Sequence, residues 1–176
     1  MLEPCCECIL AIDPGNEESA FCFIEKWTYR PVYFAKMKNR EAVLAIKNFI
    51  NEHLHFCSYE AAVEMVASYG MAVGKSVFDT CVWIGRFSQI LEDMSFSVIN
   101  IYRKDEKMSI CGQMKAKDSN IRVALVDRFA THDFKTGKGT KNNPDWFYGF
   151  AKDVWQSYAV GITYLDTRYG RWRHDK

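Results

Sequence analysis

The chain of 176 residues carries 23 Lys and Arg against 22 Asp and Glu, a formal net charge of +1 with neutral histidines. With 48% hydrophobic and 26% charged residues, its composition is that of a folded globular protein, not a disordered one. The balanced charge excludes nucleic-acid binding through a uniformly cationic surface, so any such contact must come from a local basic patch. The length suits one domain with one sizeable core, residues 1–176.

No apolar stretch reaches the roughly 18 residues that a membrane span needs, and no basic segment precedes an apolar one at the N-terminus. We therefore expect no membrane contact, no signal peptide and a cytoplasmic protein. The cysteines number 7, an odd count that favours reduced, buried thiols over a disulfide framework. His53 and His55 do not have the spacing of a zinc site.

The start of the chain predicts three strands. Residues 8–12 are a short, fully apolar run that is typical of a buried central strand. Pro14-Gly15-Asn16 then turns the chain, and residues 20–25 and 31–37 predict two hairpin-type strands.

The remainder alternates helical and strand patterns. Apolar runs predict strands over 61–67 and 96–102, and helical spacing predicts helices over 40–54, 75–94, 120–130 and 150–166. Early antiparallel strands followed by strands that alternate with helices predict one α/β domain with a mixed sheet flanked by helices.

Two basic segments flank the last predicted helix. Residues 135–144 form a glycine-containing loop, whose lysines Lys135, Lys138 and Lys141 are candidate phosphate contacts. The tail 167–176 carries Arg168, Arg171 and Arg173 between Tyr169 and Trp172. Its aromatic side chains either stack on unpaired bases or pack back on the domain.

Three acidic residues occupy positions where a solvated charge is not expected. Asp13 ends the first strand, Glu64 interrupts the apolar run 61–67, and Asp153 lies near the start of the last helix. A carboxylate at the end of a buried strand is costly to desolvate unless a cation compensates it. If the Glu64 strand is parallel to the Asp13 strand, both carboxylates reach the same edge of the sheet, and the last helix can bring Asp153 there.

Each acid also has an ordinary structural explanation. Asp13 can begin the turn as an Asx residue, Glu64 can face solvent from an edge strand, and Asp153 can favour a helix N-terminus. Their combination and their order along the chain favour a shared site, where converging carboxylates repel one another unless divalent cations bind. Hard oxygen donors suit Mg²⁺ or Mn²⁺, and a pair of such ions about 4 Å apart promotes phosphodiester cleavage.

Seven motifs follow one another along the chain. They are Asp13-Pro-Gly, Ala61-Ala-Val-Glu64, Gly70-Met-Ala-Val-Gly-Lys-Ser-Val-Phe78, Trp83-Ile-Gly-Arg-Phe87, Lys107-Met-Ser-Ile-Cys-Gly112, Lys115-Ala-Lys-Asp-Ser-Asn-Ile-Arg122 and Asp153-x-x-x-x-Tyr158-Ala-Val-Gly-Ile-Thr163. In this order they resemble the RuvC-like Holliday-junction resolvases, particularly the variants of bacteriophages and prophages. The resemblance covers residues 8 to 167 or thereabouts.

The resemblance implies a ribonuclease-H-like fold and metal-dependent cleavage of four-way DNA junctions by a homodimer, in the cytoplasm of a bacterial or phage-infected cell. By position it implies that Asp13, Glu64 and Asp153 are catalytic metal ligands for Mg²⁺, with Mn²⁺ as an alternative. It also implies that Lys107 and Lys117 are catalytic lysines that stabilise developing phosphate charge and hold the DNA backbone. Ordinary solvated lysines are the competing interpretation of both.

The chain departs from the family at Gln156. The family often has an acidic residue one helical turn after the third carboxylate, whereas the amide oxygen of Gln156 carries no charge. We therefore expect a second ion to bind more weakly, with Asp145 and Asp166 as nearby acids outside the motif. Gln156, Lys75 and Lys138 are further candidates for a second metal site or for DNA contacts.

Other functions remain open from the sequence. Segment 70–76 has one residue too few between its glycines for a phosphate-binding loop, which disfavours an ATPase. A junction binder that has lost its chemistry through Gln156 is one alternative, and a nuclease of the same fold that acts on another nucleic acid is a second. The helix 75–94, with Trp83 and Phe87, is the candidate dimer surface, because a junction requires two active sites on opposed strands. Ordinary packing on the sheet is the alternative, and both are compatible if one face of the helix is inside and the other is at the interface.

Overall fold

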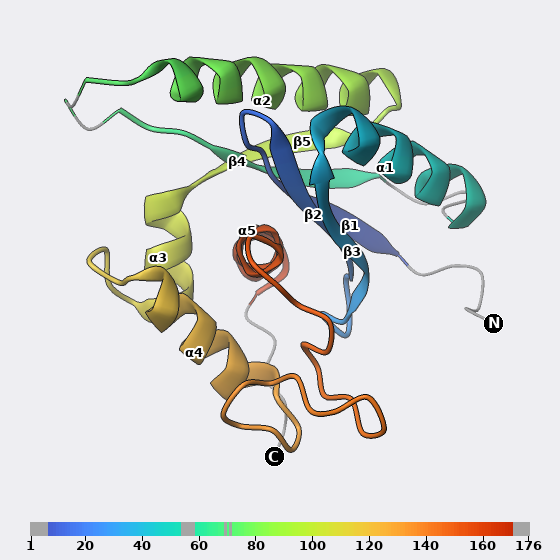
Figure 1. Ribbon diagram of the computed structural model, residues 1–176, viewed down its shortest axis with the longest axis vertical. Coiled ribbons are helices and arrows are strands. Elements are labelled where there is room, and N and C mark those ends of the chain that lie inside the picture. Colours follow the sequence, from blue (N-terminus) through green and yellow to red (C-terminus); the bar gives the residue numbers. More distant parts are fainter. Residues whose placement is uncertain (1–6, 54–58, 69, 71, 171–176) are drawn as a thin grey trace.

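Five strands form a mixed sheet at the centre of the protein (Figure 1). The computed structural model describes residues 7–53, 59–68, 70 and 72–170. The strands are β1 (Cys8–Asp13), β2 (Glu18–Glu25), β3 (Pro31–Lys38), β4 (Glu60–Met65) and β5 (Ser97–Tyr102), in the spatial order β3-β2-β1-β4-β5. β1 to β3 pair antiparallel, whereas β1 with β4 and β4 with β5 pair parallel. The predicted mixed sheet of an α/β fold is confirmed.

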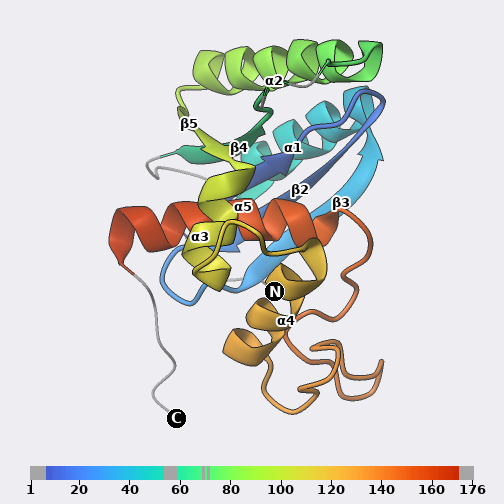
Figure 2. The ribbon, with the colours of Figure 1, turned by 90° about the vertical axis from the view of Figure 1, so that its left-hand side faces the viewer.

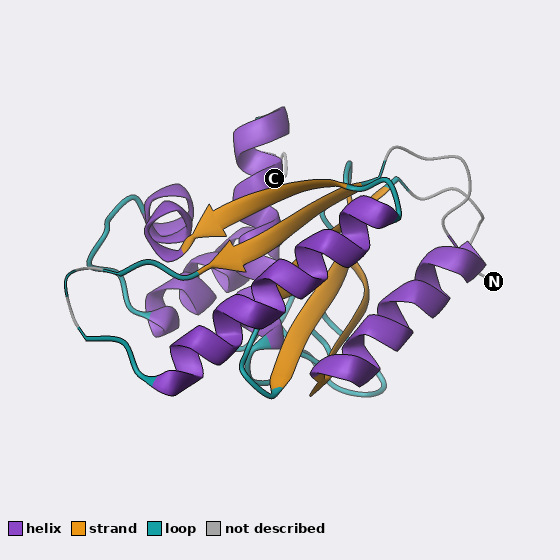
Figure 3. Ribbon diagram, turned by 90° about the horizontal axis from the view of Figure 1, so that it is seen from above, coloured by secondary structure: helices purple, strands orange, loops and turns teal. Residues whose placement is uncertain are grey.

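Helices cover both faces of this sheet. α1 (Asn39–His53) and α2 (Lys75–Asp93) lie side by side on one face (Figure 3). α5 (Val154–Tyr169) packs on the other face, and α3 (Arg103–Cys111) and α4 (Asp118–Phe129) lie on its outer side (Figure 2). In the described part of the chain, no helix combines the length and apolar character that crossing a membrane requires.

β1 is apolar from Cys8 to Ile12 because both of its faces are covered. Ile9 and Ala11 belong to the core beneath α5, whereas Leu10 and Ile12 belong to the core beneath α1 and α2. Burial of each such side chain contributes roughly 1.5–3 kcal/mol. The same alternation decides which side of the sheet the polar residue at the end of the strand faces.

α5 lies unusually close to the sheet at Gly161. A Cβ atom placed on this glycine would lie 2.3 Å from Cδ1 of Ile24 and 2.9 Å from Cβ of Ala11. Nearly every side chain from Val154 to Leu165 is buried, so α5 is the central helix of the core and not a surface helix.

Some predicted boundaries are wrong. α5 begins at Val154 and not at residue 150, because Phe147 and Phe150 enter the core from turns that precede the helix. α3 was not predicted at all: its nine residues are mostly charged or polar, and only Glu106 and Ile110 are buried. The other predicted elements differ from the observed ones by at most two residues at either end, including β4, which starts one residue earlier than predicted and ends two residues earlier, at Met65.

The ends of the predicted segments also change. The helix predicted to residue 54 ends at His53 in the described range, and His55 lies outside the described residues. Arg168 and Tyr169 belong to the last turn of α5 and not to a separate tail. Arg171, Trp172 and Arg173 lie outside the described residues.

α2 places its two candidate interface residues differently. Phe87 is buried with Ile84 and Leu91 against the sheet, so it is a core residue and not part of an outer surface. Trp83 is partly buried at the edge of the same core. The exposed apolar side chains of α2 are instead Phe78 and Val82, on the opposite side of the helix, because they lie about half a turn away from Phe87.

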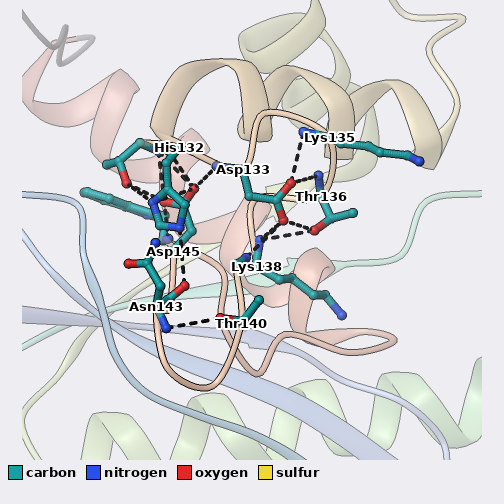
Figure 4. A network of polar contacts seen from close by, with 11 residues as sticks. His132, Asp133, Lys135, Thr136, Lys138, Thr140, Asn143 and Asp145 are labelled. Atoms are coloured by element: carbon teal, nitrogen blue, oxygen red, sulfur yellow. Dashed lines mark hydrogen bonds and ion pairs between the residues drawn. The ribbon is translucent and has the colours of Figure 1, made fainter.

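The segment between α4 and α5, the 131–149 loop, is organised around two carboxylates (Figure 4). Asp133 accepts hydrogen bonds from the backbone of Thr136 at 3.0 Å and Gly139 at 3.0 Å. Asp145 accepts the backbone N–H groups of Thr131, His132, Asp133 and Trp146. The basic segment 135–144 of the loop is therefore held by hydrogen bonds. Gly137 and Gly139 adopt the positive φ angles of 68° and 65° that its turns require.

Candidate active site

Asp13 and Glu64 are brought together by the parallel pairing of β1 and β4. Ile12 lies opposite Val63 in this register, so the next residue on each strand, Asp13 and Glu64, ends the pair side by side. Ala11 and Ala62 face α5, and alternate residues of a strand share a face. The two carboxyl groups therefore face α5, and a hydrogen bond joins their side chains.

The pKa values of both carboxyl groups lie above their usual range. Burial, and then the charge of Glu64, raise the pKa of Asp13 well above its usual range. Burial also raises the pKa of Glu64, while the hydrogen bond from Asp13 and the charge of Arg103 oppose this rise. Such a pair favours any cation that can replace the proton.

Asp153 approaches the same place from the residue that precedes α5. Its carboxylate is half-exposed and lies 2.6 Å from Nζ of Lys36 on β3, which also lies 3.3 Å from Glu18. Lys36 is reached across the sheet, because Asp13 pairs with Ala20 and Ala20 pairs with Lys36. The ion pair with Lys36 thus holds Asp153 beside Asp13 and Glu64.

A cavity of about 680 Å³ joins these groups. The predicted carboxylates Asp13, Glu64 and Asp153 line it, and so does Gln156. Its opposite wall is the first half of α4, including Asp118 and Arg122. Segments that are far apart in the sequence, around residues 13, 64, 118–125 and 152–156, therefore meet at the end of β1 and β4.

The whole chain resembles solved structures of junction resolvases. Thermus thermophilus RuvC superposes with a TM-score of 0.61 at 14% sequence identity, covering 93% of this chain and 96% of that one. The same protein in complex with a Holliday junction substrate gives 0.62 at 14% identity with equal coverage. Fowlpox virus resolvase, in complex with Holliday junction DNA, gives 0.52 at 11% identity and covers 92% of this chain and 99% of that one.

The chain has a RuvC-like fold. No protein-family model matches the sequence, and no curated protein matches it either. The fold resemblance expected from the motifs is confirmed, whereas the roles of the individual residues come from their positions in the site.

The cations that line the cavity of this RuvC-like fold differ from those expected. Lys107 is partly exposed on α3 and Lys117 is exposed just before α4, and neither lines the cavity. Lys75 is exposed and pairs with Asp79 at 2.6 Å, and Lys138 lies in the 131–149 loop. Among the described residues, the cationic side chains of the lining are those of Arg103, Arg122 and Lys152.

Asp145 and Asp166, the nearby acids outside the motif, do not line the cavity either. Asp145 holds the 131–149 loop, and both carboxylate oxygens of Asp166 accept hydrogen bonds from Arg128 at 2.6 and 2.7 Å. They therefore do not supply the charge that is missing at Gln156.

Arg103 connects the acids of three elements. Its guanidinium lies 3.8 Å from Glu64 on β4, 3.1 Å from Glu106 on α3 and 2.6 Å from Asp118 on α4. Burial lowers the pKa of this guanidinium, but the surrounding carboxylates outweigh it and raise the pKa overall. Arg103 thereby balances part of the acidic charge beside the cavity.

Glu106 is a site residue that the sequence did not indicate. Its side chain is fully buried, and burial, followed by the charge of Glu64, raises its pKa to about 10. Gln156 Nε2 donates a hydrogen bond to Glu106 Oε2, whereas Oε1 has no hydrogen-bond partner. The only sequence signal was that Glu106 and Ile110 share a face of a helix, and it becomes visible only once α3 is known to exist.

The donor set fits a divalent cation of the Mg²⁺ type. The described residues contain no group of three His, Cys, Asp or Glu side chains arranged to hold a metal ion, and the carboxylate of Asp153 is paired with Lys36. Asp13 and Glu64 nevertheless offer adjacent, desolvated oxygen donors whose repulsion a divalent ion would relieve. We expect Asp153 to exchange Lys36 for the ion.

Proposed function

We propose that the protein is a metal-dependent endonuclease that cleaves branched DNA and resolves four-way junctions. The observation that carries this proposal is the pair Asp13 and Glu64, placed side by side in a cavity that Asp153 and Gln156 also line. The support from comparison is that two of the similar structures are resolvases in complex with Holliday junctions.

In this mechanism Asp13, Glu64 and Asp153 hold Mg²⁺ or Mn²⁺. A bound divalent ion polarises the phosphodiester and supplies an activated water. Binding of the ion would require Asp13 and Glu64 in their ionised forms and Asp153 released from its ion pair with Lys36. Gln156 lines the same cavity, where it would offer its amide oxygen.

Arg122 is suited to hold the phosphodiester backbone. Its guanidinium lies 4.6 Å from the ring centre of Trp155, and no ion pair with a carboxylate is found for it among the described residues. Stacking on the ring leaves the in-plane N–H groups available, and a planar guanidinium suits bidentate contacts to phosphate. In this proposal Arg122 and Lys152 contact the DNA backbone, a role that the family resemblance implied for Lys107 and Lys117.

The proposed active form is a homodimer, because two opposed strands must be cut. α2 offers Phe78 and Val82, whose side chains are 60% and 51% exposed, as the centre of the contact. Both lie on the side of α2 opposite its buried face. Exposed apolar side chains on one helix face are a feature of protein–protein contacts.

The test is cleavage of a synthetic four-way junction in Mg²⁺ and in Mn²⁺. We expect paired cuts on opposed strands, and we expect Asp13→Asn and Glu64→Gln each to reduce the rate about 100-fold or more, since a metal contributes several kcal/mol to the transition state. Asp127→Asn, an exposed carboxylate on α4 outside the cavity, is the control and should cut normally.

Two outcomes would point to the alternatives. Tight junction binding without cleavage in either metal would favour a non-catalytic binder. Faster cleavage of an RNA–DNA hybrid than of a branched DNA would favour a nuclease with another substrate.

A further inference from the structure

A part-buried hydrogen bond joins Gln156 and Glu106 at the side of the site where the resemblance leads one to expect an acid. Glu106 lies on α3 and its side chain has no solvent exposure. Its Oε2 accepts a hydrogen bond from Gln156 Nε2, and Nη1 of Arg103 lies 3.1 Å from the same oxygen. Oε1 of Glu106 is buried without a hydrogen-bond partner.

This arrangement decides which edge of the amide is exposed to the cavity. The side-chain amide of Gln156 has a donor edge and an acceptor edge, and a rotation of half a turn exchanges them. Since the donor edge is bound to Glu106, the carbonyl oxygen points away from Glu106, and Gln156 lines the cavity. A glutamine in the opposite orientation would present N–H groups, which repel a cation.

The position of Glu106 is hard to explain by its own packing. A fully buried carboxyl group with an unpartnered oxygen costs free energy that an apolar residue at this helix position would not cost. Its two contacts, Gln156 and Arg103, are both residues that line the cavity. The carboxyl group therefore acts on the site through its neighbours.

We propose that Glu106 is a positioning residue that orients Gln156, so that the carbonyl oxygen of Gln156 becomes a neutral oxygen donor for a divalent cation in the cavity. The inference rests on the proposed metal-dependent function. In this site the amide of Gln156 lines the cavity, and the carboxyl group of Glu106 contacts that amide without lining the cavity itself.

The first test compares the affinity of the wild type and of Glu106 variants for Mn²⁺ in the absence of DNA. The protein is titrated with Mn²⁺, and electron paramagnetic resonance measures the free ion. Glu106→Leu removes the acceptor, and we expect it to weaken the binding of Mn²⁺ about 10-fold or more, as for other residues that orient metal ligands. Glu106→Gln keeps a carbonyl acceptor, which the donors Gln156 and Arg103 select, and we expect it to bind Mn²⁺ within about 3-fold of the wild type. Asp127→Asn is the control.

The second test exchanges the two side chains. Gln156→Glu alone places two carboxyl groups in hydrogen-bond contact, so it should not bind Mn²⁺ more tightly than the wild type. The double variant Gln156→Glu/Glu106→Gln restores one amide and one carboxylate, now with the charge on the cavity side. We expect this double variant to bind Mn²⁺ about 10-fold more tightly than Gln156→Glu, because no second carboxyl group at position 106 competes with the ion for the carboxylate at position 156.

The outcomes separate the inference from the proposed function. If the wild type binds no Mn²⁺, the metal-dependent function and the inference both fall. If the wild type binds Mn²⁺ but Glu106→Leu binds it equally well, only the inference falls. If circular dichroism shows that Glu106→Leu does not fold, the second test, with the exchanged side chains, is used instead. A double variant that binds Mn²⁺ no more tightly than Gln156→Glu would overturn the inference.

Discussion

Single charged residues decide the electrostatics of the site more than its overall charge does. Asp13 and Glu64 are desolvated side by side, while Lys36 and Arg103 balance Asp153 and Glu64 from the two flanks. The protein has a net charge of only +1, so the field that a phosphodiester meets is set by the groups that line the cavity.

Arg122 provides a prediction at this scale. We expect Arg122→Gln to weaken junction binding and to reduce the slope of log K against log salt concentration by about 1, as the loss of one phosphate contact does. The measurement is fluorescence anisotropy with a labelled junction in Ca²⁺ at several salt concentrations.

A matched control is present on α2. Arg86 lies 4.8 Å from the ring centre of Trp83, a similar stacked arrangement that does not line the cavity. Arg86→Gln should leave the salt slope closer to the wild type. An equal loss in both variants would mean that Arg122 contributes only general positive charge.

At the scale of the elements, α5 is positioned by its close approach to the sheet at Gly161. Alanine is normally preferred in helices by about 1 kcal/mol over glycine. At Gly161 an added Cβ would lie 2.9 Å from Cβ of Ala11, which is fixed in the central strand. The close approach of α5 also keeps Gln156, near its start, beside the ends of β1 and β4.

We expect Gly161→Ala to lower the free energy of unfolding by about 1–3 kcal/mol, because overpacking outweighs the helix propensity. Urea unfolding measures this. Gly85→Ala on α2 is the control, since its Cβ would meet nothing within 4 Å, and it should stabilise the protein by about 0.5–1 kcal/mol. A stabilising Gly161→Ala would contradict the packing given for α5.

The 131–149 loop gives a prediction that depends on pH. Burial alone would raise the pKa of Asp145, but hydrogen bonds from the backbone N–H groups of His132, Asp133 and Thr131 outweigh it and hold the pKa well below its usual value of 3.8. A lowered pKa means that the stabilisation is full above this value and is lost as the pH falls through the folded-state pKa.

We therefore expect Asp145→Asn to lower the melting temperature at neutral pH, with a loss of about 1–3 kcal/mol for hydrogen bonds to a buried charge. The difference from the wild type should shrink when the pH falls below about 3. Thermal melts followed by circular dichroism over this pH range check the prediction. A difference that stays constant with pH would show that the charge of Asp145 is unimportant.

At the scale of the whole molecule, the two faces of the sheet have different tasks. α5 lies on one side of the sheet, and α1 and α2 lie on the other (Figure 1). Both sides have an apolar core, but the carboxyl groups of Asp13 and Glu64 face α5, whereas the exposed Phe78 and Val82 belong to α2. A second subunit bound at α2, as proposed, would therefore leave the cavity uncovered.

We expect Phe78→Asp and Val82→Asp to shift a dimer to a monomer in sedimentation velocity, because a charge in a desolvated contact is costly. Both positions are exposed in the single chain, so the fold should remain intact, as judged by an unchanged melting temperature at low concentration. Leu44→Asp, at an exposed residue of α1, is the control. Dimers that persist in both α2 variants would place the contact elsewhere.

Much of the fold follows from local patterns. The fully apolar run of β1, the helical spacing of α1, α2 and α4, and the acids at the ends of two parallel strands are all visible in the sequence, because side-chain periodicity reflects which faces are covered. The parallel pairing that Asp13 and Glu64 required was a hypothesis, and the register of β1 and β4 supports their proximity.

The polar contacts between segments that are distant in the sequence are known only from the tertiary structure. The burial of Glu106, the ion pair of Lys36 with Asp153 and the contacts of Arg103 depend on how α3 and β3 pack against the ends of other elements. α3 itself has too few apolar residues to show a helical pattern, and its helix is completed by packing against α5. Side-chain periodicity in the sequence indicates the type of each element and its buried face. The surroundings of a charged side chain depend on residues of other elements, which this local periodicity does not identify.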